Sequence, residues 1–160
     1  QMDLELVLVG ELDYFYKKLQ NRILGFKFQS VSWRTSFKRI IFTDFVSDKD
    51  LKILYQNASL YIFPSLCEGF GLPPLEAMSY GLPVISSNAT CLQEILGEAA
   101  FYFNPEDINE ITEAIKCVLE DSDLRKRLIH NGFKQIEKYS WPRMAKRTLE
   151  TYQNIILSRS

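Results

Sequence analysis

The chain has 160 residues, of which 46% are apolar and 24% are charged, and its formal net charge is −1 at pH 7. These values are typical of one globular domain with its own core, and they exclude a disordered chain. The near-neutral charge argues against a nucleic-acid partner, which selects a basic surface. Because no apolar run approaches the ~20 residues of a membrane span and no signal peptide opens the sequence, we expect a cytoplasmic location.

Short apolar stretches alternate with amphipathic stretches along the chain. The short stretches predict five strands, at Leu4–Val9, Arg39–Phe42, Leu60–Phe63, Pro83–Ser86 and Ala99–Phe103. The first of them is predicted to be apolar and buried. The stretch over residues 28–37, which is rich in serine, is predicted to be a loop.

Helices are predicted from apolar spacing and from residues that begin or end a helix. The first helix carries Phe15, Leu19 and Ile23 and continues to about Lys27. A capping box at Ser47–Asp50 begins the second helix, which directs Leu51, Leu54 and Ala58 inward. A short helix runs from Pro74, its first residue, to Tyr80, and Gly81 ends it. A second capping box, Thr90 with Gln93, begins a brief helix that ends at Gly97.

Three amphipathic helices complete the sequence. Their apolar stripes are Ile108, Ile111, Ile115 and Val118, then Leu124, Leu128 and Ile136, and finally Trp141, Ala145, Leu149, Tyr152 and Ile156. This alternation predicts a Rossmann-like α/β fold, with a doubly wound, mostly parallel sheet and helices on both faces. In such folds the ligand binds beyond the carboxyl ends of the strands, where the loop at 64–73 is expected to lie.

The sequence from Glu68 to Ala77, EGFGLPPLEA, is the most informative motif. Gly69 and Gly71 allow backbone amides to approach a ligand, and the following helix N-terminus attracts anions. Glu68 and Glu76, the latter predicted in the first helical turn, can accept hydrogen bonds from two parts of a polyol. The motif therefore predicts a site for a phosphorylated sugar.

Other motifs do not support a different site. Gly69 and Gly71 lack the third glycine of a dinucleotide fingerprint, because residue 74 is proline, and the chain has no P-loop. Asp121-Ser122-Asp123 resembles a metal-binding Asp-x-Asp, but either Asp121 or Ser122 is more simply a helix cap. Cys67 has no histidine partner, and the lone His130 is interpreted as the polar end of a helix. Cys67, Cys91 and Cys117 are expected to be free thiols, and no structural zinc is expected.

The motif resembles the signature of the retaining glycosyltransferase family 4, which has the GT-B fold. The match extends from Glu68 through Met78, and it continues through Phe63-Pro64-Ser65, Gly81-Leu82-Pro83-Val84 and Tyr139-Ser140-Trp141. The resemblance covers nearly the whole chain. It implies that residues 1–160 form a single donor-binding domain of a two-domain enzyme, with residues 141–160 as its C-terminal helix.

The resemblance also implies roles for individual residues. Glu68 would be the catalytic residue facing the transferred sugar, and Glu76 would bind the ribose hydroxyls. The amides of Gly69, Phe70, Gly71 and Leu72 would hold the diphosphate and the donor sugar. Phe45 and Val46 would contact the nucleobase. The donor would be a UDP-sugar or a GDP-sugar, transferred with retention and without a metal ion or another cofactor.

Two departures from the family pattern matter. Asp44 stands where the family usually has glycine. The family's C-terminal half also opens with a strand, and with an arginine and a lysine that bind the diphosphate, before the part that matches this chain. We count Glu11, Asp13, Asp44, Asp48, Glu68 and Glu76 at the predicted ligand edge, against Lys49 alone. The isolated chain is therefore expected to bind a sugar nucleotide weakly, to be inactive, and to fill the place of the first strand by rearranged pairing or a neighbouring chain.

The sequence thus predicts the donor-binding domain of a glycosyltransferase of polysaccharide or glycolipid synthesis. Its partners would be a nucleotide-sugar donor, a glycan or lipid-linked acceptor and an N-terminal acceptor domain. The alternatives are a sugar-nucleotide epimerase or a phosphorylase on the same fold, or a non-catalytic binding module. The last predicted helix carries Arg143, Lys146 and Arg147, which allows peripheral contact with a membrane, although a solvated face is the simpler interpretation.

Overall fold

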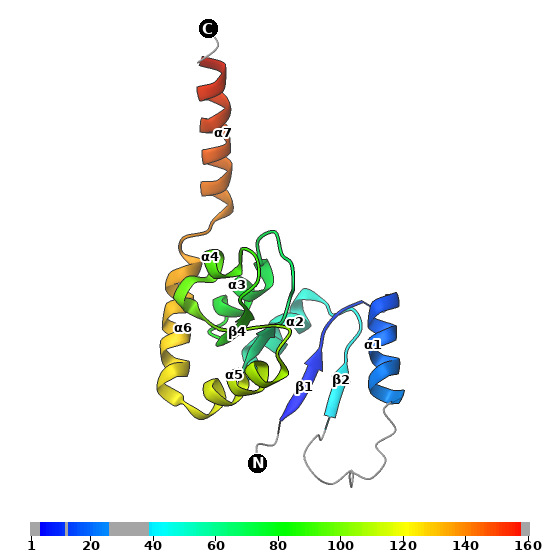
Figure 1. The fold of residues 1–160 in the computed structure, drawn as a ribbon. Coiled ribbons are helices and arrows are strands. Elements are labelled where there is room, and N and C mark those ends of the chain that lie inside the picture. The colour runs from blue at the N-terminus through cyan, green and yellow to red at the C-terminus, as the bar shows by residue number, and fades with distance from the viewer. Residues whose placement is uncertain (1–3, 12, 26–38, 158–160) are drawn as a thin grey trace. The chain divides into compact units, whose positions relative to one another are not determined.

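The computed structural model describes residues 4–11, 13–25 and 39–157 (Figure 1). The predicted loop over residues 28–37 lies outside these ranges. The chain divides into two compact units, Gln1–Leu51 and Lys52–Ser160, here called unit 1 and unit 2. Every described strand pair is parallel, which confirms the predicted α/β class.

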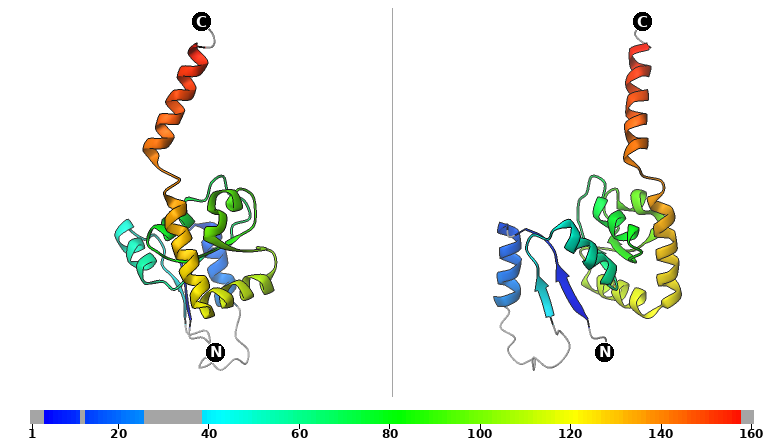
Figure 2. Two further views of the ribbon diagram at one scale, coloured as in Figure 1. Left: turned by 90° about the vertical axis from the view of Figure 1, so that its left-hand side faces the viewer. Right: turned by 180° about the vertical axis from the view of Figure 1, so that it is seen from behind.

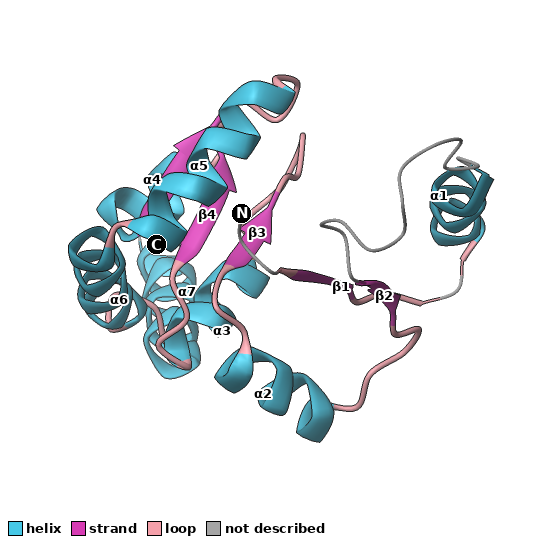
Figure 3. Ribbon diagram, turned by 90° about the horizontal axis from the view of Figure 1, so that it is seen from below, coloured by secondary structure: helices cyan, strands magenta, loops and turns pink. Residues whose placement is uncertain are grey.

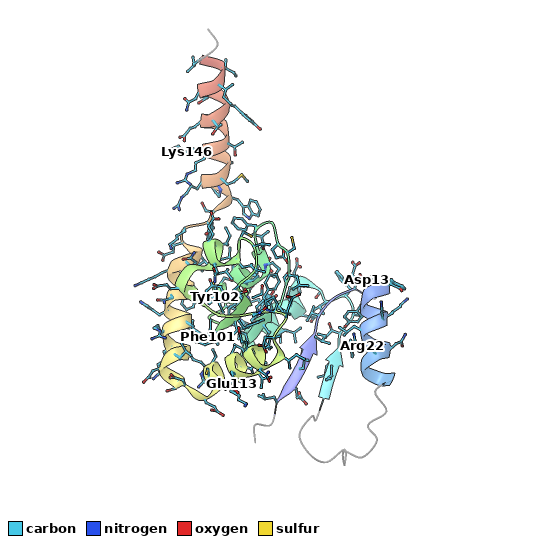
Figure 4. The ribbon with its side chains drawn as sticks, viewed as in Figure 1. Asp13, Arg22, Phe101, Tyr102, Glu113 and Lys146 are labelled. Atoms are coloured by element: carbon cyan, nitrogen blue, oxygen red, sulfur yellow. The ribbon has the colours of Figure 1, made fainter. Side chains whose placement is uncertain are left out.

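Unit 1 contains two strands and a helix. Strand β1 (Glu5–Leu8) pairs in parallel with β2 (Arg39–Phe42), with Leu6 opposite Ile40. Helix α1 (Tyr14–Gly25) lies between them in sequence. It begins at a side-chain cap, because the Asp13 carboxylate accepts a hydrogen bond of 2.7 Å from the Tyr16 N–H (Figure 4).

The prediction that the first strand is buried is wrong. Leu6 is 43% exposed, and the neighbouring Val7 and Val9 are also exposed. A strand is buried only when neighbouring strands and packed layers cover it on both faces. The sheet of β1 has two strands in the described part of the chain, so an apolar sequence alone does not bury it.

Unit 2 contains a three-stranded sheet in the order β3-β4-β5. Its strands are β3 (Tyr61–Phe63), β4 (Val84–Ser87) and β5 (Ala100–Phe103). The helices are α2 (Asp48–Asn57), which crosses the boundary between the units, α3 (Leu72–Ser79), α4 (Leu92–Leu96), the 3-10 helix η1 (Gly97–Ala99), α5 (Ile108–Glu120), α6 (Ser122–Ile136) and α7 (Trp141–Leu157). Figure 3 shows α5 and α3 on opposite sides of this sheet.

The core of unit 2 lies between the sheet and the α5–α6 pair. Ile85 and Phe103 pack with Val118 of α5 and with Leu124 and Leu128 of α6. Only Asp121 separates α5 from α6, so the two helices fold back on one another (Figure 2). The opposite face of the sheet carries Tyr61 and Phe63, because side chains alternate along a strand.

Several local signals are confirmed. The Ser47 hydroxyl accepts from the Asp50 N–H at 3.3 Å, which is the N-cap bond of the predicted capping box, and it donates to the Asp50 carboxylate at 2.7 Å. Asp121 caps α6 by accepting from the N–H groups of Asp123 and Leu124. Gly81 ends α3 in the left-handed conformation, with φ of 72°.

Two helix predictions need correction. Ala58 lies beyond the end of α2 and is exposed, and the residue of α2 that is buried is Tyr55. The apolar stripe predicted for the last helix is present on α7, but no residue of α7 is buried. Peripheral contact of α7 with a membrane stays a prediction. Among the described residues, no helix combines the length and the apolar character of a membrane span.

The described strands form two sheets instead of one. Strand β1 pairs only with β2, and β3 pairs only with β4, so each has one unpaired edge among the described residues. The expectation that the family's first strand is missing from a central sheet stays a prediction. Which strand completes the sheet stays a prediction.

Candidate functional site

Two loops of unit 2 meet at the carboxyl edge of its sheet. The first, residues 64–71, follows β3, and the second, residues 87–91, begins with the last residue of β4. Because β3 and β4 are parallel neighbours, both loops leave the same edge. The Ser87 hydroxyl joins them by donating a hydrogen bond to the Ser65 carbonyl. The predicted motif therefore begins on the edge where ligands bind in this class of fold.

Gly71 is the residue that turns the first loop into α3. It is the N-cap of α3 and has φ of 94°, a left-handed conformation that glycine adopts at little cost. A Cβ at this position would lie 2.7 Å from Cδ2 of Leu92, whose side chain is fully buried. At Gly69, in contrast, a Cβ would have no neighbour within 4 Å. Backbone at Gly69 is thus open to a ligand, whereas Gly71 is required by the fold.

Helix α3 begins at Leu72, two residues earlier than predicted. Pro74 is consequently the third helical residue and not the first, because both Pro73 and Pro74 fit in a first turn, where the N–H groups have no helical partner. The prolines remove two of the donors that a helix N-terminus normally offers. The remaining donors are the amides of Gly71 and Leu72, both among the residues predicted to hold a diphosphate.

Glu76 is the fifth residue of α3, so its predicted place in the first turn is wrong. It contacts a cluster of aromatic rings. Tyr55 is 8% exposed, stacks on Tyr80 with 5.6 Å between ring centroids, and meets Tyr61 edge to face at 5.7 Å. Tyr80 follows Glu76 by four residues, so both lie on the same side of α3. The Glu76 carboxylate lies near the Tyr55 hydroxyl, since it contributes to raising the pKa of that phenol.

The same cluster changes the ionisation of its tyrosines. Burial, with the Glu76 carboxylate as the next cause, raises the pKa of Tyr55 to about 12. Burial also raises the pKa of Tyr61. Both shifts favour the neutral phenol, which can donate a hydrogen bond to a carboxylate.

We expect the stability of the chain to fall above pH 10, in part because of Tyr55. An unfolded tyrosine ionises near pH 10, whereas folded Tyr55 keeps its proton up to about pH 12. The folded state then binds more protons, so the free energy of unfolding decreases from about pH 10 until the folded pKa is passed. Thermal unfolding from about pH 8 to about pH 11.5 should show a smaller decrease for Tyr55→Phe. An equal decrease for Tyr55→Phe and for Tyr152→Phe, whose ring is exposed on α7, would contradict this cause.

Phe70 and Glu68 occupy the middle of the first loop. The Phe70 ring meets the Tyr139 ring edge to face, with 5.3 Å between centroids, and the Tyr139 hydroxyl donates to the Ile95 carbonyl at 3.0 Å. The Phe70 side chain is therefore held against unit 2, and only its amide remains to serve a ligand as predicted. Glu68 is half-buried, and its backbone is bound to the second loop by Thr90 and Cys91.

Phe45 and Val46 belong to unit 1, where they follow β2. Phe45 is 72% exposed. The preceding Asp44 has φ of 61°, a left-handed conformation in which glycine is the usual residue and aspartate is tolerated. This conformation explains how aspartate replaces the expected glycine. The Asp44 N–H donates to the Tyr16 hydroxyl at 3.3 Å, and that hydroxyl donates to the Leu8 carbonyl at 2.9 Å, so the ends of both strands are linked.

The structure describes the residues of the other motifs considered in the sequence, Asp121, His130 and the three cysteines. Amide hydrogen bonds from Leu124 and Asp123 lower the pKa of Asp121, as expected of a helix cap. His130 lies exposed on α6, and all three cysteines are free. No group of three or more potential metal ligands occurs among the described residues. Independence of metal ions stays a prediction.

Sequence reasoning does not assign the roles of two residues at this site, Tyr55 and Thr90. Tyr55 was overlooked because the apolar spacing favoured Ala58, although an aromatic side chain one turn earlier offered the larger surface. Thr90 was assigned to a capping box with Gln93, and this is wrong, because α4 has no side-chain cap and its N-cap is Cys91. The Thr90 hydroxyl instead accepts from the Glu68 N–H, 22 residues earlier in sequence.

Comparison with known proteins gives consistent matches. A family model described as "Glycosyl transferases group 1" matches residues 1–135. The serotype-specific mannosyltransferase WbdA of Escherichia coli is 39% identical over 127 residues, 79% of this chain and 16% of its own length. The O-antigen chain mannosyltransferase B of Escherichia coli is 39% identical over 114 residues, 71% of this chain and 30% of its own length.

A solved structure is also similar over almost the whole chain. The sucrose-phosphate synthase of Thermosynechococcus elongatus superposes with a TM-score of 0.78 at 25% identity, covering 96% of this chain and 39% of the synthase. The chain therefore spans well under half the length of each protein compared.

Proposed function

The chain belongs to the group 1 glycosyl transferases, and we propose that it is the part of such an enzyme that binds a nucleotide diphosphate sugar. In this proposal Glu68 faces the transferred sugar and is the catalytic residue, while Glu76 binds the ribose. The amides of Gly69, Phe70, Gly71 and Leu72 hold the diphosphate and the donor sugar.

The geometry of the loop after β3 carries this proposal. The loop begins at the carboxyl edge of the sheet, has open backbone at Gly69, and ends at the N-terminus of α3. Backbone amides and a helix N-terminus bind phosphate groups, and carboxylates accept hydrogen bonds from sugar hydroxyls. One loop thus offers groups for the ribose, the diphosphate and the sugar of a nucleotide sugar. In unit 1, Phe45 and Val46 are proposed to contact the base.

The charge of the loop sets a limit on its affinity. Residues 64–76 include Glu68 and Glu76 but no lysine or arginine. A helix N-terminus contributes only about 0.3 to 1 kcal/mol toward an anion at an exposed site. We therefore propose that cations outside this loop are needed for tight binding, and that the isolated chain binds weakly and does not turn over.

The proposed reaction is transfer with retention of configuration and without a metal ion. Stabilisation of the departing diphosphate by fixed donors would be the main catalytic contribution. The similarity to two mannosyltransferases supports mannose as the sugar and a polysaccharide or a glycolipid as the product. The acceptor, the acceptor-binding domain and the cytoplasmic location are proposals about the whole protein.

Protection of Cys67 from alkylation tests this function. Cys67 is exposed and adjoins Glu68, whereas Cys117 is equally exposed but lies on α5. Millimolar GDP-mannose or UDP-glucose should slow the reaction of Cys67 with iodoacetamide, because the bound sugar would cover the loop, and should leave Cys117 unchanged. Mass spectrometry of the peptides reads both rates in one sample. Equal alkylation rates of Cys67 with and without each ligand at millimolar concentration would contradict the proposal.

A further inference from the structure

The second loop binds the backbone of Glu68 at both of its polar atoms. The Glu68 N–H donates to Oγ1 of Thr90 at 3.2 Å, and Sγ of Cys91 donates to the Glu68 carbonyl at 3.2 Å. We call Thr90 and Cys91 the Glu68 clamp. The clamp joins two consecutive residues after β4 to one residue of the loop after β3, across more than 20 positions of sequence.

Thr90 holds a backbone conformation that its residue type avoids. Its φ is 50°, in the left-handed region, which is an outlier for a β-branched side chain. Strained residues of this kind persist where surrounding structure requires them, and they are frequent at functional sites. The adjoining helix does not explain Thr90, because the N-cap of α4 is Cys91 and the helix has no side-chain cap.

The two loops also have a connection that does not involve Glu68. The Ser87 hydroxyl already donates to the Ser65 carbonyl. The clamp additionally fixes the backbone of Glu68, the residue that carries the carboxylate of this loop. The Glu68 side chain is half exposed, and no hydrogen bond from a described residue reaches its carboxylate. Its backbone is thus fixed while its acid group remains available to a ligand.

We infer that Thr90 and Cys91 are positioning residues, which hold Glu68 so that its carboxylate faces the transferred sugar. This inference rests on the proposed function. A carboxylate contributes to sugar recognition only if it is held close to its productive geometry. The clamp should therefore affect the sugar part of the ligand and leave the nucleotide diphosphate part almost unchanged.

A ligand-free measurement tests the clamp itself. Hydrogen exchange at the Glu68 amide, followed by NMR, should be about tenfold faster in Thr90→Val, which loses the acceptor oxygen. Thr90→Ser should keep the exchange rate of the natural chain, because the hydroxyl remains. Thr112→Val is the matched control, since it also removes a threonine hydroxyl bound to the backbone, although that hydroxyl donates to the Ile108 carbonyl on the exposed side of α5. An unchanged exchange rate of the Glu68 amide in Thr90→Val would show that Thr90 does not hold the backbone of Glu68.

A ligand titration tests its purpose. The preference for GDP-mannose over GDP, or for UDP-glucose over UDP, is measured as the ratio of the two dissociation constants. Thr90→Val and Cys91→Ala should reduce this ratio several-fold, while Thr90→Ser and Thr112→Val should keep it. Thr90→Gly should reduce the ratio and yet raise the melting temperature, because glycine relieves the left-handed strain. If Thr90→Gly acted only by unfolding the chain, it would lower both the ratio of dissociation constants and the melting temperature.

The outcomes separate this inference from the proposed function. A natural chain that prefers the sugar nucleotide, together with a Thr90→Val variant that keeps the preference, would overturn only the positioning role. A natural chain that responds to none of these four ligands would overturn the proposed function and, with it, the positioning role.

Discussion

Replacing Gly71 with alanine is expected to lower the free energy of unfolding by about 2 to 3 kcal/mol. The φ of 94° places a side chain in the left-handed region, which costs about 1 to 2 kcal/mol for a residue with a Cβ. The added Cβ would also lie 2.7 Å from Cδ2 of the fully buried Leu92, so the core must shift. Urea denaturation followed by far-UV circular dichroism measures the change.

Gly69→Ala is the control for this prediction. It makes the same chemical change two residues earlier, but its Cβ would meet nothing within 4 Å. Its free energy of unfolding should change by no more than about 0.5 to 1 kcal/mol. Equal losses in the two variants would show that neither the left-handed turn nor the contact with Leu92 is a constraint.

Replacing Glu76 with glutamine is expected to weaken binding of GDP or UDP about 10- to 100-fold. Glutamine keeps the size of the side chain but loses the charge, and a hydrogen bond to a charged group contributes about 1.5 to 3 kcal/mol. Because Glu76 is proposed to bind the ribose, the nucleotide and the sugar nucleotide should lose affinity by the same factor. Protein NMR titration suits this measurement, since it detects millimolar dissociation constants.

Glu68→Gln, unlike Glu76→Gln, should affect the two kinds of ligand differently. Its loss should appear with the sugar nucleotide and be nearly absent with the nucleotide alone, because Glu68 is proposed to face the sugar. Glu113→Gln serves as the control, since this exposed acid lies on α5 (Figure 4). If Glu76→Gln and Glu113→Gln bind GDP and UDP equally well, Glu76 does not bind the ribose.

The parts of the fold that depend on residues close in sequence could be predicted from the sequence. The caps at Ser47 and Asp121 and the left-handed turn at Gly81 are decided within a few residues, and all three are confirmed. Apolar spacing, together with residues that begin or end a helix, likewise located the α-helices of the described residues, although several ends differ by one or two residues. The difference at α3 arose because two adjacent prolines both satisfy the rule for a first turn.

The parts that depend on distant residues could not be predicted in the same way. Burial of Leu6 and Val7 requires partners that a strand's own sequence does not specify. Thr90 fits a capping box locally, but the partner it binds is Glu68, which only the parallel pairing of β3 and β4 brings near. The motif identified the ligand loop, whereas Thr90, which binds the backbone of Glu68, and Tyr55, which lies near Glu76, belong to other elements.

The unpaired edge of β3 has a consequence for the handling of the chain. The backbone N–H and C=O groups on the side away from β4 have no strand partner among the described residues, and the strand is apolar and free of charge. Such an edge is a template for strand addition by another copy. The chain in solution should therefore self-associate as its concentration rises. Substitution of Ile62 by lysine would not be a suitable way to prevent this, because the Ile62 side chain packs against the core. Dilute samples, or a short peptide of matching strand sequence added in trans, are the better means of keeping it monodisperse.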